Sequence, residues 1–459
     1  MKKQNCDLMI VDCDVVLPDF SLLQNAAITV TDGKICDIGN VADILSKYTA
    51  SSTIKGDGKL AIPGMYDCHT HTVQQLLKGG TIDEPPIIWR RILVPYESTM
   101  TPEDRYQAAR LYCIQALKAG ITMFADAGSM DMSGTIHAIE ETGIRAAVAR
   151  VGRDLDSELP ESMCDRTADK CIQAQEQLYK NYHNTCDGRL KIWYSISSPM
   201  SASPELVDGI SAAAREGKTG IHIHLGEHPA EVQTCLKRFG MRPPEFMAKH
   251  GALGPNVIAA HCIQITDFDI RLMAEYGVNV IHCPTANLQT QGIPKLLAER
   301  AAGINIALGN DGATTSRQDM FGQAKLRKYV CQAVYGTPVF EPIVLPLKEA
   351  FNMMTLNGAK ALGVSDVLGS LEPGKIADIA LLNIDKVDYQ PSRNILHTMM
   401  MVASANDITD VIIGGKVILK DKEFTELDEE KILYEGKAQM QKIVTDFMNC
   451  HATAFTGCH

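Results

Sequence analysis

The chain has 459 residues, of which 45% are apolar and 22% charged, the balance of a well-packed protein rather than a disordered one. Its 44 basic and 55 acidic residues give a formal charge of −11. Without a basic run it has no electrostatic footprint for nucleic acid or for an anionic membrane surface. No stretch approaches the ~20 uninterrupted apolar residues of a membrane helix, and no apolar segment follows the N-terminal lysines as a signal peptide requires. The fourteen cysteines are irregularly spaced, so we expect a soluble, cytoplasmic protein with reduced thiols.

Both ends of the chain have the pattern of short strands joined by tight turns. The strand candidates are residues 8–11, 27–30, 34–38, 377–382 and 411–419. Asp32-Gly33 between two of these runs is a hairpin-turn signal. Two such ends flanking a different middle predict one small composite β-sandwich, built from residues 1–60 and 365–425.

The long middle of the chain, residues 61–364, alternates apolar strand candidates with helical patterns. The strand candidates are residues 120–124, 145–149, 191–195, 220–224, 257–261, 278–282 and 304–308, and the clearest helical patterns are residues 103–118 and 266–276. Such alternation over about 300 residues predicts parallel βαβ units. Eight units would close a TIM-type (β/α)8 barrel, so the expected fold class is α/β. No GxGxxG or GxxxxGK[ST] motif opens a helix, which disfavours a dinucleotide-binding or P-loop fold. For residues 426–459 we expect a C-terminal helix and tail.

The first candidate site residues are His69 and His71, which end an apolar run. In a strand, residues i and i+2 point to the same side, so the two imidazoles would face one point. This geometry suits a metal ion. Taken alone, the pair could equally be two polar residues at a strand end.

Four further apolar strand candidates end in a histidine or an aspartate. The first ends in His224, with Glu227 three positions later, and the next ones end in His261, His282 and Asp311. Roughly 20 to 40 residues separate successive members of this series, which suits one strand–helix repeat. The carboxyl ends of barrel strands meet at one rim, where barrel enzymes keep their active sites. The sequence therefore predicts that these groups converge at that rim.

Together these motifs resemble those of the amidohydrolase superfamily. The resemblance rests on Pro63-Gly64-x-x-Asp67-x-His69-x-His71, His224-x-x-Glu227, Ala260-His261-Cys262, His282-Cys283-Pro284 and Leu308-Gly309-Asn310-Asp311-Gly312. Residues 32–35 and 369–378 resemble the split β-sandwich signatures of the same superfamily. Within it, the chain is similar to the mononuclear-metal aminohydrolase branch, which includes cytosine, guanine and S-adenosylhomocysteine/methylthioadenosine deaminases. The resemblance covers nearly the whole length.

The resemblance implies one divalent metal ion held by His69, His71, His224 and Asp311. Three imidazoles and a carboxylate suit zinc, the expected metal, or ferrous iron, with one position left for water. Binuclear members of the superfamily need a carboxylated lysine at the end of a middle strand. No lysine stands there in this sequence, which favours a single metal.

The resemblance also implies the catalytic roles. The metal makes a hydroxide available near neutral pH, and Asp311 takes the water proton. Glu227 protonates a ring nitrogen of the substrate, while His261 hydrogen-bonds the attacking oxygen. The expected reaction is hydrolytic release of ammonia from an amino-substituted N-heterocycle or cyclic amidine. His222, one residue pair deeper in its strand than His224, is expected to pack or to support a ligand.

Substrate contacts are expected from the first loops of the barrel. Gln75 lies in a segment that resembles the family's loop over the substrate ring. Trp89 and Glu97 lie in one that resembles the ribose-contacting segment of nucleoside-type deaminases. Ser197 stands where nucleoside and purine members usually carry a histidine, so a small ring such as creatinine or cytosine, or a pterin, competes with an adenosine derivative. His282 either touches the substrate or only fixes its strand end.

Two other functions stay open. One is a triazine-type hydrolase with another leaving group, such as a halide or an alkylamine, although the presence of both Glu227 and Asp311 favours deamination. The other is a non-catalytic homologue, which the loss of a metal ligand would signal, and none is lost. We expect a small-molecule heterocycle as the partner, no nucleic acid, no membrane, and a homo-oligomer, dimer or larger.

Overall fold

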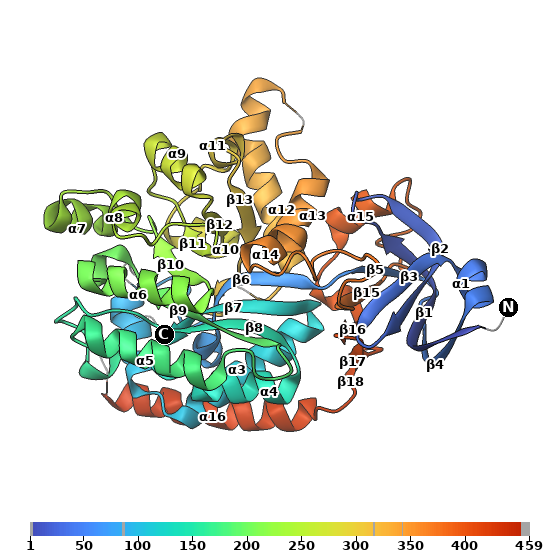
Figure 1. Cartoon of the computed structure of the whole chain (residues 1–459), viewed down its shortest axis with the longest axis horizontal. Coiled ribbons are helices and arrows are strands. Elements are labelled where there is room, and N and C mark those ends of the chain that lie inside the picture. Colours follow the sequence, from blue (N-terminus) through green and yellow to red (C-terminus); the bar gives the residue numbers. More distant parts are fainter. Residues whose placement is uncertain (1–2, 85–87, 315–316, 342, 451–459) are drawn as a thin grey trace. The chain divides into compact units, whose positions relative to one another are not determined.

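The computed structural model describes residues 3–84, 88–314, 317–341 and 343–450, and Figure 1 labels its helices and strands. The chain forms two compact units. The sheet unit comprises Met1–Asp67, Gln115–Met123 and Gln318–Leu427, and the barrel unit comprises Cys68–Ile114, Phe124–Arg317 and Asp428–His459. The domain boundaries expected from the sequence stay a prediction.

The sheet unit contains one mixed sheet made from both ends of the chain. Its strands are β1 (Gln4–Val16), β2 (Leu22–Thr31), β3 (Lys34–Asn40), β4 (Tyr48–Lys55), β5 (Lys59–Pro63), β15 (Ile379–Asn383), β16 (Ile408–Ile413), β17 (Lys416–Lys420) and β18 (Glu423–Phe424). They are ordered β18-β17-β16-β15-β5-β1-β2-β3, with β4 paired to β1. The β5–β15 pairing joins the two chain ends, which confirms the composite sheet expected from the sequence.

Alternating apolar side chains give this sheet its core. Leu8 and Ile10 of β1 pack with residues of β2, β5, β15 and β16 in one buried cluster, as the period of two in a strand requires. Asp32 (φ 50°) and Gly33 (φ 72°) form the turn between β2 and β3, the left-handed pair that suits a two-residue hairpin. A Cβ on Gly33 would lie 2.7 Å from the carbonyl oxygen of Gly414, so only glycine fits there. The helices of this unit are α1 (Val41–Lys47), α12 (Met320–Cys331), α13 (Leu347–Met354), α14 (Leu356–Ala361) and α15 (Ile395–Val402).

The second sheet is the barrel. Its strands are β6 (Met65–His71), β7 (Ile121–Ser129), β8 (Arg145–Arg150), β9 (Leu190–Ile196), β10 (Ile221–Leu225), β11 (Val257–His261), β12 (Asn279–His282), β13 (Asn305–Leu308) and β14 (Asp311–Gly312). Consecutive strands from β6 to β13 are neighbours, and β14 pairs with β6 on its far side. Because only two residues separate β14 from β13, the extension of the eighth strand pairs with the first and closes the ring. The expected (β/α)8 barrel is confirmed.

Helices cover the outside of the ring, as the buried strands of a parallel sheet require. They are α2 (Val94–Thr99), α3 (Pro102–Lys118), α4 (Ser133–Thr142), α5 (Ala168–Tyr182), α6 (Pro204–Gly217), α7 (Pro229–Phe239), α8 (Pro243–Lys249), α9 (Asp267–Tyr276), α10 (Pro284–Thr290) and α11 (Leu296–Ala301), with short turns η1 (Thr72–Leu77) and η2 (Trp89–Leu93). Helix α5 packs on β8 and β9, and α6 packs on β9 and β10 (Figure 1).

The C-terminal helix expected from the sequence is α16 (Glu429–Cys450). It packs on the first segments after β6: Ile443 joins a buried cluster with Val73 of η1 and Tyr96 of α2. An ion pair of 2.6 Å between Arg110 Nη1 and Glu435 Oε2 ties the same helix to α3. The expected tail, residues 451–459, lies outside the described residues.

Two expectations about the whole chain can be compared with the structure. Among the described residues, no helix is both long and apolar enough to span a membrane. The twelve cysteines whose side chains are described are all free thiols, as their irregular spacing predicted.

Candidate metal centre and catalytic site

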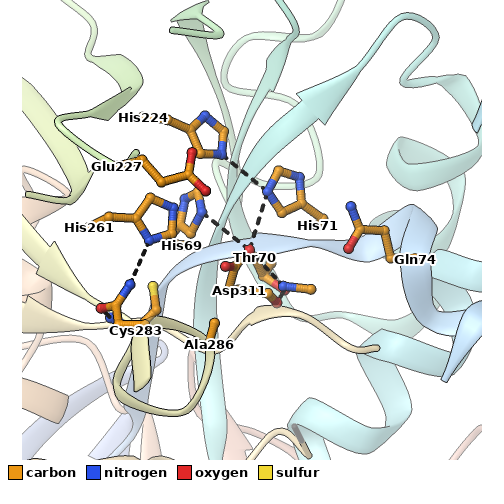
Figure 2. Close-up of polar contacts among 12 residues, drawn as sticks. His69, Thr70, His71, Gln74, His224, Glu227, His261, Cys283, Ala286 and Asp311 are labelled. Carbon is orange, nitrogen blue, oxygen red and sulfur yellow. Dashed lines mark hydrogen bonds and ion pairs between the residues drawn. The ribbon is translucent and has the colours of Figure 1, made fainter. Parts of the chain in front are cut away.

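The side chains predicted to form a site come together at the carboxyl rim of the barrel. His69 and His71 end β6, His224 lies near the end of β10, His261 ends β11 and Asp311 begins β14. All five belong to the barrel unit. Figure 2 shows their imidazole and carboxylate groups pointing toward one region. The ring closure described above places Asp311 opposite Thr70 in the β14–β6 pairing, between the two β6 histidines in register.

The donor atoms of this cluster are close enough to share an ion. Asp311 Oδ1 lies 3.6 Å from His69 Nε2 and 3.5 Å from His71 Nε2. The Nε2 atoms of His71 and His224 lie 3.3 Å apart. In two overlapping groups, His69 with His71 and Asp311, and His69 with His224 and His261, the donor atoms all lie within 4.8 Å of one another. Converging imidazoles and a carboxylate are a donor set that suits zinc.

The protonation states of the cluster also suit a metal. Burial lowers the pKa of His69 and His224 and brings the pKa of His71 down to about 3. Burial opposes ionisation of Asp311, but the neighbouring imidazoles of His69, His261 and His71 hold its pKa well below its usual range. At neutral pH the site therefore contains neutral imidazoles and an ionised carboxylate, the forms that bind metal.

Neighbouring groups orient two of the imidazoles. His224 Nδ1 lies 2.7 Å from the backbone carbonyl oxygen of Ser197, so Nδ1 donates and Nε2 carries its lone pair toward the cluster. His69 Nδ1 lies 2.7 Å from His222 Nε2, and His222 thus supports a candidate ligand, as its position in the strand predicted. Ser197 acts here through its backbone. Contact of its side chain with a substrate stays a prediction.

His261 has an unusual backbone and one fixed partner. Its φ is 76°, that of Cys262 is 51° and that of Asp311 is 65°, all in the left-handed region that residues other than glycine rarely adopt. His261 Nδ1 lies 2.9 Å from Asn287 Nδ2. Its Nε2 is buried and has no hydrogen-bond partner among the described residues. Strained backbone of this kind concentrates at functional sites, where the surrounding fold holds it.

Glu227 lies in the loop after β10. The backbone N–H groups of Gly226 and Glu227 donate to the two carboxylate oxygens of Glu231, at 2.8 and 3.0 Å. Burial raises the pKa of Glu231 to about 8. The Glu227 side chain accepts a hydrogen bond of 2.6 Å from Gln291 Nε2, and Figure 2 shows its carboxylate beside His224 and His261.

A second group of predicted residues lies on η1, η2 and α2. Glu97 is buried, which raises its pKa, and it accepts a hydrogen bond of 3.0 Å from Gln74 Nε2. The guanidinium of Arg153 lies 5.3 Å from the centre of the Trp89 ring. Arg153 is only 5% exposed, and its Nε and Nη1 have no hydrogen-bond partner within the described ranges. The Arg153 charge partly offsets the effect of burial on the pKa of Glu97, and it adds to the effect of burial in lowering the pKa of His71. Arg153 thus acts electrostatically on both Glu97 and a candidate metal ligand.

Two other residues, His282 and Gln75, were also predicted to contact the substrate. His282 Nε2 is 2.9 Å from Glu299 Oε2, and both side chains are fully buried. This pair favours the alternative in which His282 fixes its strand end, and its contact with a substrate stays a prediction. Gln75 is buried in η1, but its neighbour Gln74 makes the hydrogen bond to Glu97.

Sequence reasoning did not find Gln74, Arg153, Asn287 or Gln291. For three of these residues, the position in the sequence shortly after a barrel strand could have indicated a place near the site. Arg153 follows the end of β8 by three residues. Asn287 and Gln291 lie four positions apart in the segment after β12, the spacing at which side chains of a helical turn are neighbours.

A TIM-type barrel whose carboxyl rim gathers histidines, an aspartate and a glutamate defines a barrel hydrolase with a candidate metal centre. The sequence profile of the Amidohydrolase family matches residues 60–418, and the chain belongs to this family. It is accordingly a hydrolase of carbon–nitrogen bonds other than peptide bonds, and the resemblance drawn from its motifs is confirmed.

Relatives and solved structures agree with this assignment over almost the whole chain. A 5-methylthioadenosine/S-adenosylhomocysteine deaminase from Acetivibrio thermocellus is 32% identical over 95% of this chain and 100% of its own length. A 5'-deoxyadenosine deaminase from Methanothermobacter thermautotrophicus is also 32% identical, over 91% of this chain and 94% of its own. The crystal structure of an adenosine deaminase from Xanthomonas campestris with bound zinc is 26% identical and has a TM-score of 0.89. The match covers 97% of this chain and all of that one.

Proposed function

We propose that this chain is a metal-dependent hydrolytic deaminase of an adenosine-type nucleoside. One observation carries the proposal: Asp311, Glu227 and His261 surround the same histidine cluster at the barrel rim (Figure 2). A carboxylate, a second acid and an imidazole around one point are the groups that adding water to an aminated ring carbon requires.

The residues present fit a single divalent ion. The neutral imidazoles of His69, His71 and His224 and the ionised carboxylate of Asp311 would hold it, with zinc the expected metal and ferrous iron the alternative. When bound, the metal would supply a water molecule whose pKa is lowered to near 7.

The side chains of this chain would then move the protons. Asp311 accepts a proton from the attacking water, because its carboxylate is ionised at neutral pH. Glu227 gives a proton to the ring nitrogen next to the reacting carbon, and His261 donates a hydrogen bond to the incoming oxygen. The oxygen adds to the ring carbon, the carbon–nitrogen bond breaks, and the amino group leaves as ammonia with the proton that Asp311 returns. The proton left on the added hydroxyl passes to Glu227, so that a carbonyl forms on the ring and Glu227 regains its acid form.

The substrate class rests on two supports. The relatives at 32% identity are named as deaminases of adenosine derivatives. In this chain, the buried Glu97 carboxylate would accept hydrogen bonds from sugar hydroxyls, and the Trp89 ring, which lies against Arg153, would offer an aromatic surface. Arg153 keeps donor groups available beside both, for a polar substituent on the sugar.

Ser197 favours a second candidate, a small ring such as cytosine or creatinine. The side chain at this position is a hydroxyl where nucleoside deaminases of this branch usually have an imidazole, so one donor to the purine ring is missing. A small heterocycle without a sugar would not need that donor.

Metal analysis and an ammonia-release screen test the proposal together. The panel contains 5'-methylthioadenosine, S-adenosylhomocysteine, 5'-deoxyadenosine and adenosine against cytosine, guanine, creatinine and a pterin. We expect about one metal per chain and ammonia from the adenosine derivatives. Glu227→Gln should reduce kcat ~10²–10⁴-fold, the range for loss of a general acid, and the exposed control Glu205→Gln should leave it unchanged. Protein without metal, or full activity of Glu227→Gln, would overturn the mechanism, and ammonia from cytosine or creatinine alone would overturn the substrate class.

A further inference from the structure

Two amide side chains, Asn287 on helix α10 and Gln291 at the C-cap of that helix, link the side chains of His261 and Glu227. Asn287 Nδ2 lies 2.9 Å from His261 Nδ1 and 2.5 Å from Gln291 Oε1. Gln291 Nε2 lies 2.6 Å from Glu227 Oε1. Asn287 is completely buried, so its polar atoms depend on these partners.

The donor and acceptor of each of these hydrogen bonds follow from the contact between the Cys283 backbone and Asn287. The backbone N–H of Cys283 lies 3.0 Å from Asn287 Oδ1, and an N–H can only donate. Oδ1 is therefore the acceptor of the Asn287 amide, and Nδ2 must donate both to His261 Nδ1 and to Gln291 Oε1. With Gln291 Oε1 accepting, its Nε2 faces Glu227 and donates to that carboxylate.

The consequence for His261 is a defined tautomer. A neutral imidazole whose Nδ1 accepts a hydrogen bond carries its proton on Nε2. That Nε2 is buried, has no partner among the described residues and belongs to the cluster around His69 and His224. His261 is then a hydrogen-bond donor toward the reacting oxygen, since a protonated nitrogen cannot also bind the metal.

The consequence for Glu227 is a defined orientation. Oε1 of Glu227 accepts the hydrogen bond from Gln291, while the backbone N–H of Glu227 donates to Glu231. The second oxygen, Oε2, remains available for the proton that the substrate ring receives.

We infer that Asn287 and Gln291 are positioning residues that set the proton on His261 and the orientation of Glu227 through one directional hydrogen-bond chain. The inference rests on the proposed function for what the two side chains do, but the tautomer of His261 is a property of the protein without substrate.

Asn287→Asp is the sharpest test because it keeps the shape of the side chain. Oδ1 can still accept from Cys283, whereas the atom facing His261 Nδ1 becomes an acceptor, so the imidazole must carry a proton on Nδ1. Leu288→Ala, an exposed change on the same helix, is the matched control. Gln291→Met removes only the link to Glu227.

The first readout is ¹⁵N NMR of the zinc-loaded protein with labelled histidine, assigned by loss of the His261 signals in His261→Asn. We expect wild type and Leu288→Ala to show the Nε2-protonated form, and Asn287→Asp to show a protonated Nδ1. A wild-type spectrum with Nδ1 protonated, or one that Asn287→Asp leaves unchanged, would overturn the inference whether or not any substrate is deaminated.

The second readout is steady-state kinetics on the substrate that the wild type deaminates. Asn287→Asp and Gln291→Met should lower kcat ~10–100-fold, the effect usual for groups that orient an active residue. KM should stay within about threefold and zinc content at the wild-type level. Unchanged kcat in both variants, or a loss of zinc that accounts for the whole fall in activity, would contradict the assignment.

Discussion

Gly309 directly follows β13 and lies against the backbone of His69. Adding one methyl group there tests how the barrel holds its candidate metal ligands. A Cβ on residue 309 would lie 2.8 Å from the carbonyl oxygen of His69 and 2.9 Å from its Cβ and its N. Ordinary van der Waals contacts begin at 3.4 Å, so the two strands must separate by about 0.5 Å. A displacement of about 0.5 Å is the largest that the side chains of a functional site usually tolerate. The N–H of Gly309 also donates to the His282 carbonyl at 2.9 Å, which resists movement in the other direction.

Gly309→Ala should therefore weaken both the fold and the site. We expect a loss of about 1–3 kcal/mol in the free energy of unfolding, the usual effect of overpacking. We also expect ~10–100-fold weaker zinc binding, because His69 moves with its backbone. Urea unfolding of the metal-free protein gives the first quantity, and competition with a chromophoric chelator gives the second.

Gly39→Ala is the matched control for this change. The nearest atoms to a Cβ at residue 39 belong to Ile44, at 3.5 and 3.6 Å, which is ordinary contact. This variant should bind zinc as the wild type does and unfold within about 1 kcal/mol of it. If Gly309→Ala matched the wild type in both measurements, the argument that strand closure at Gly309 positions His69 would be refuted.

Three further predictions concern buried charges and the metal. Burial raises the pKa of Asp126 to about 6 from 3.8 despite hydrogen bonds from Thr72 and Gly128, so its stabilising contribution is complete below about pH 4 and is lost as the pH rises through 6. Asp126→Asn should gain up to ~3 kcal/mol relative to the wild type across that window, and a pH-independent difference in urea unfolding would contradict this. Glu299→Ala removes one partner of the buried pair with His282 and should lower the free energy of unfolding by about 3–5 kcal/mol with KM unchanged. A raised KM at unchanged stability would instead place His282 on the substrate. Removal of metal by a chelator should lower Tm, and zinc at ~100 times its Kd should restore about 2.7 kcal/mol; a Tm that does not respond to zinc would argue against zinc binding by the folded chain.

The fold and the cluster of candidate metal ligands could be predicted because both follow from strand geometry. Side chains two apart in a strand share a face, and carboxyl ends of successive parallel strands meet at one rim. His69, His71, His224 and Asp311 follow these rules directly, so their positions along the chain are enough to bring them together.

The side chains that orient the site follow no such rule. Gln74 and Gln75 are adjacent in a 3-10 helix, where neighbours point about 120° apart, and only the packed position of Glu97 selects Gln74. Asn287 acts through its contact with His261, a residue from another strand, and the direction of that bond is fixed by the Cys283 N–H. Contacts of this kind depend on tertiary packing, and no repeating pattern of residues in the sequence indicates them.

The left-handed backbone conformation at three positions in and beside the candidate site limits which substitutions can stabilise the chain. At His261, Cys262 and Asp311 glycine would be the less strained residue, by about 1–3 kcal/mol at each position. Selection for thermal stability alone would thus favour glycine at all three. Only Cys262, whose thiol lies 3.6 Å from the Ala259 carbonyl, could accept glycine without removing a side chain of the candidate site. Variants selected for higher thermal stability should therefore replace Cys262 first. His261 and Asp311 should keep their strained backbone as long as selection also requires turnover.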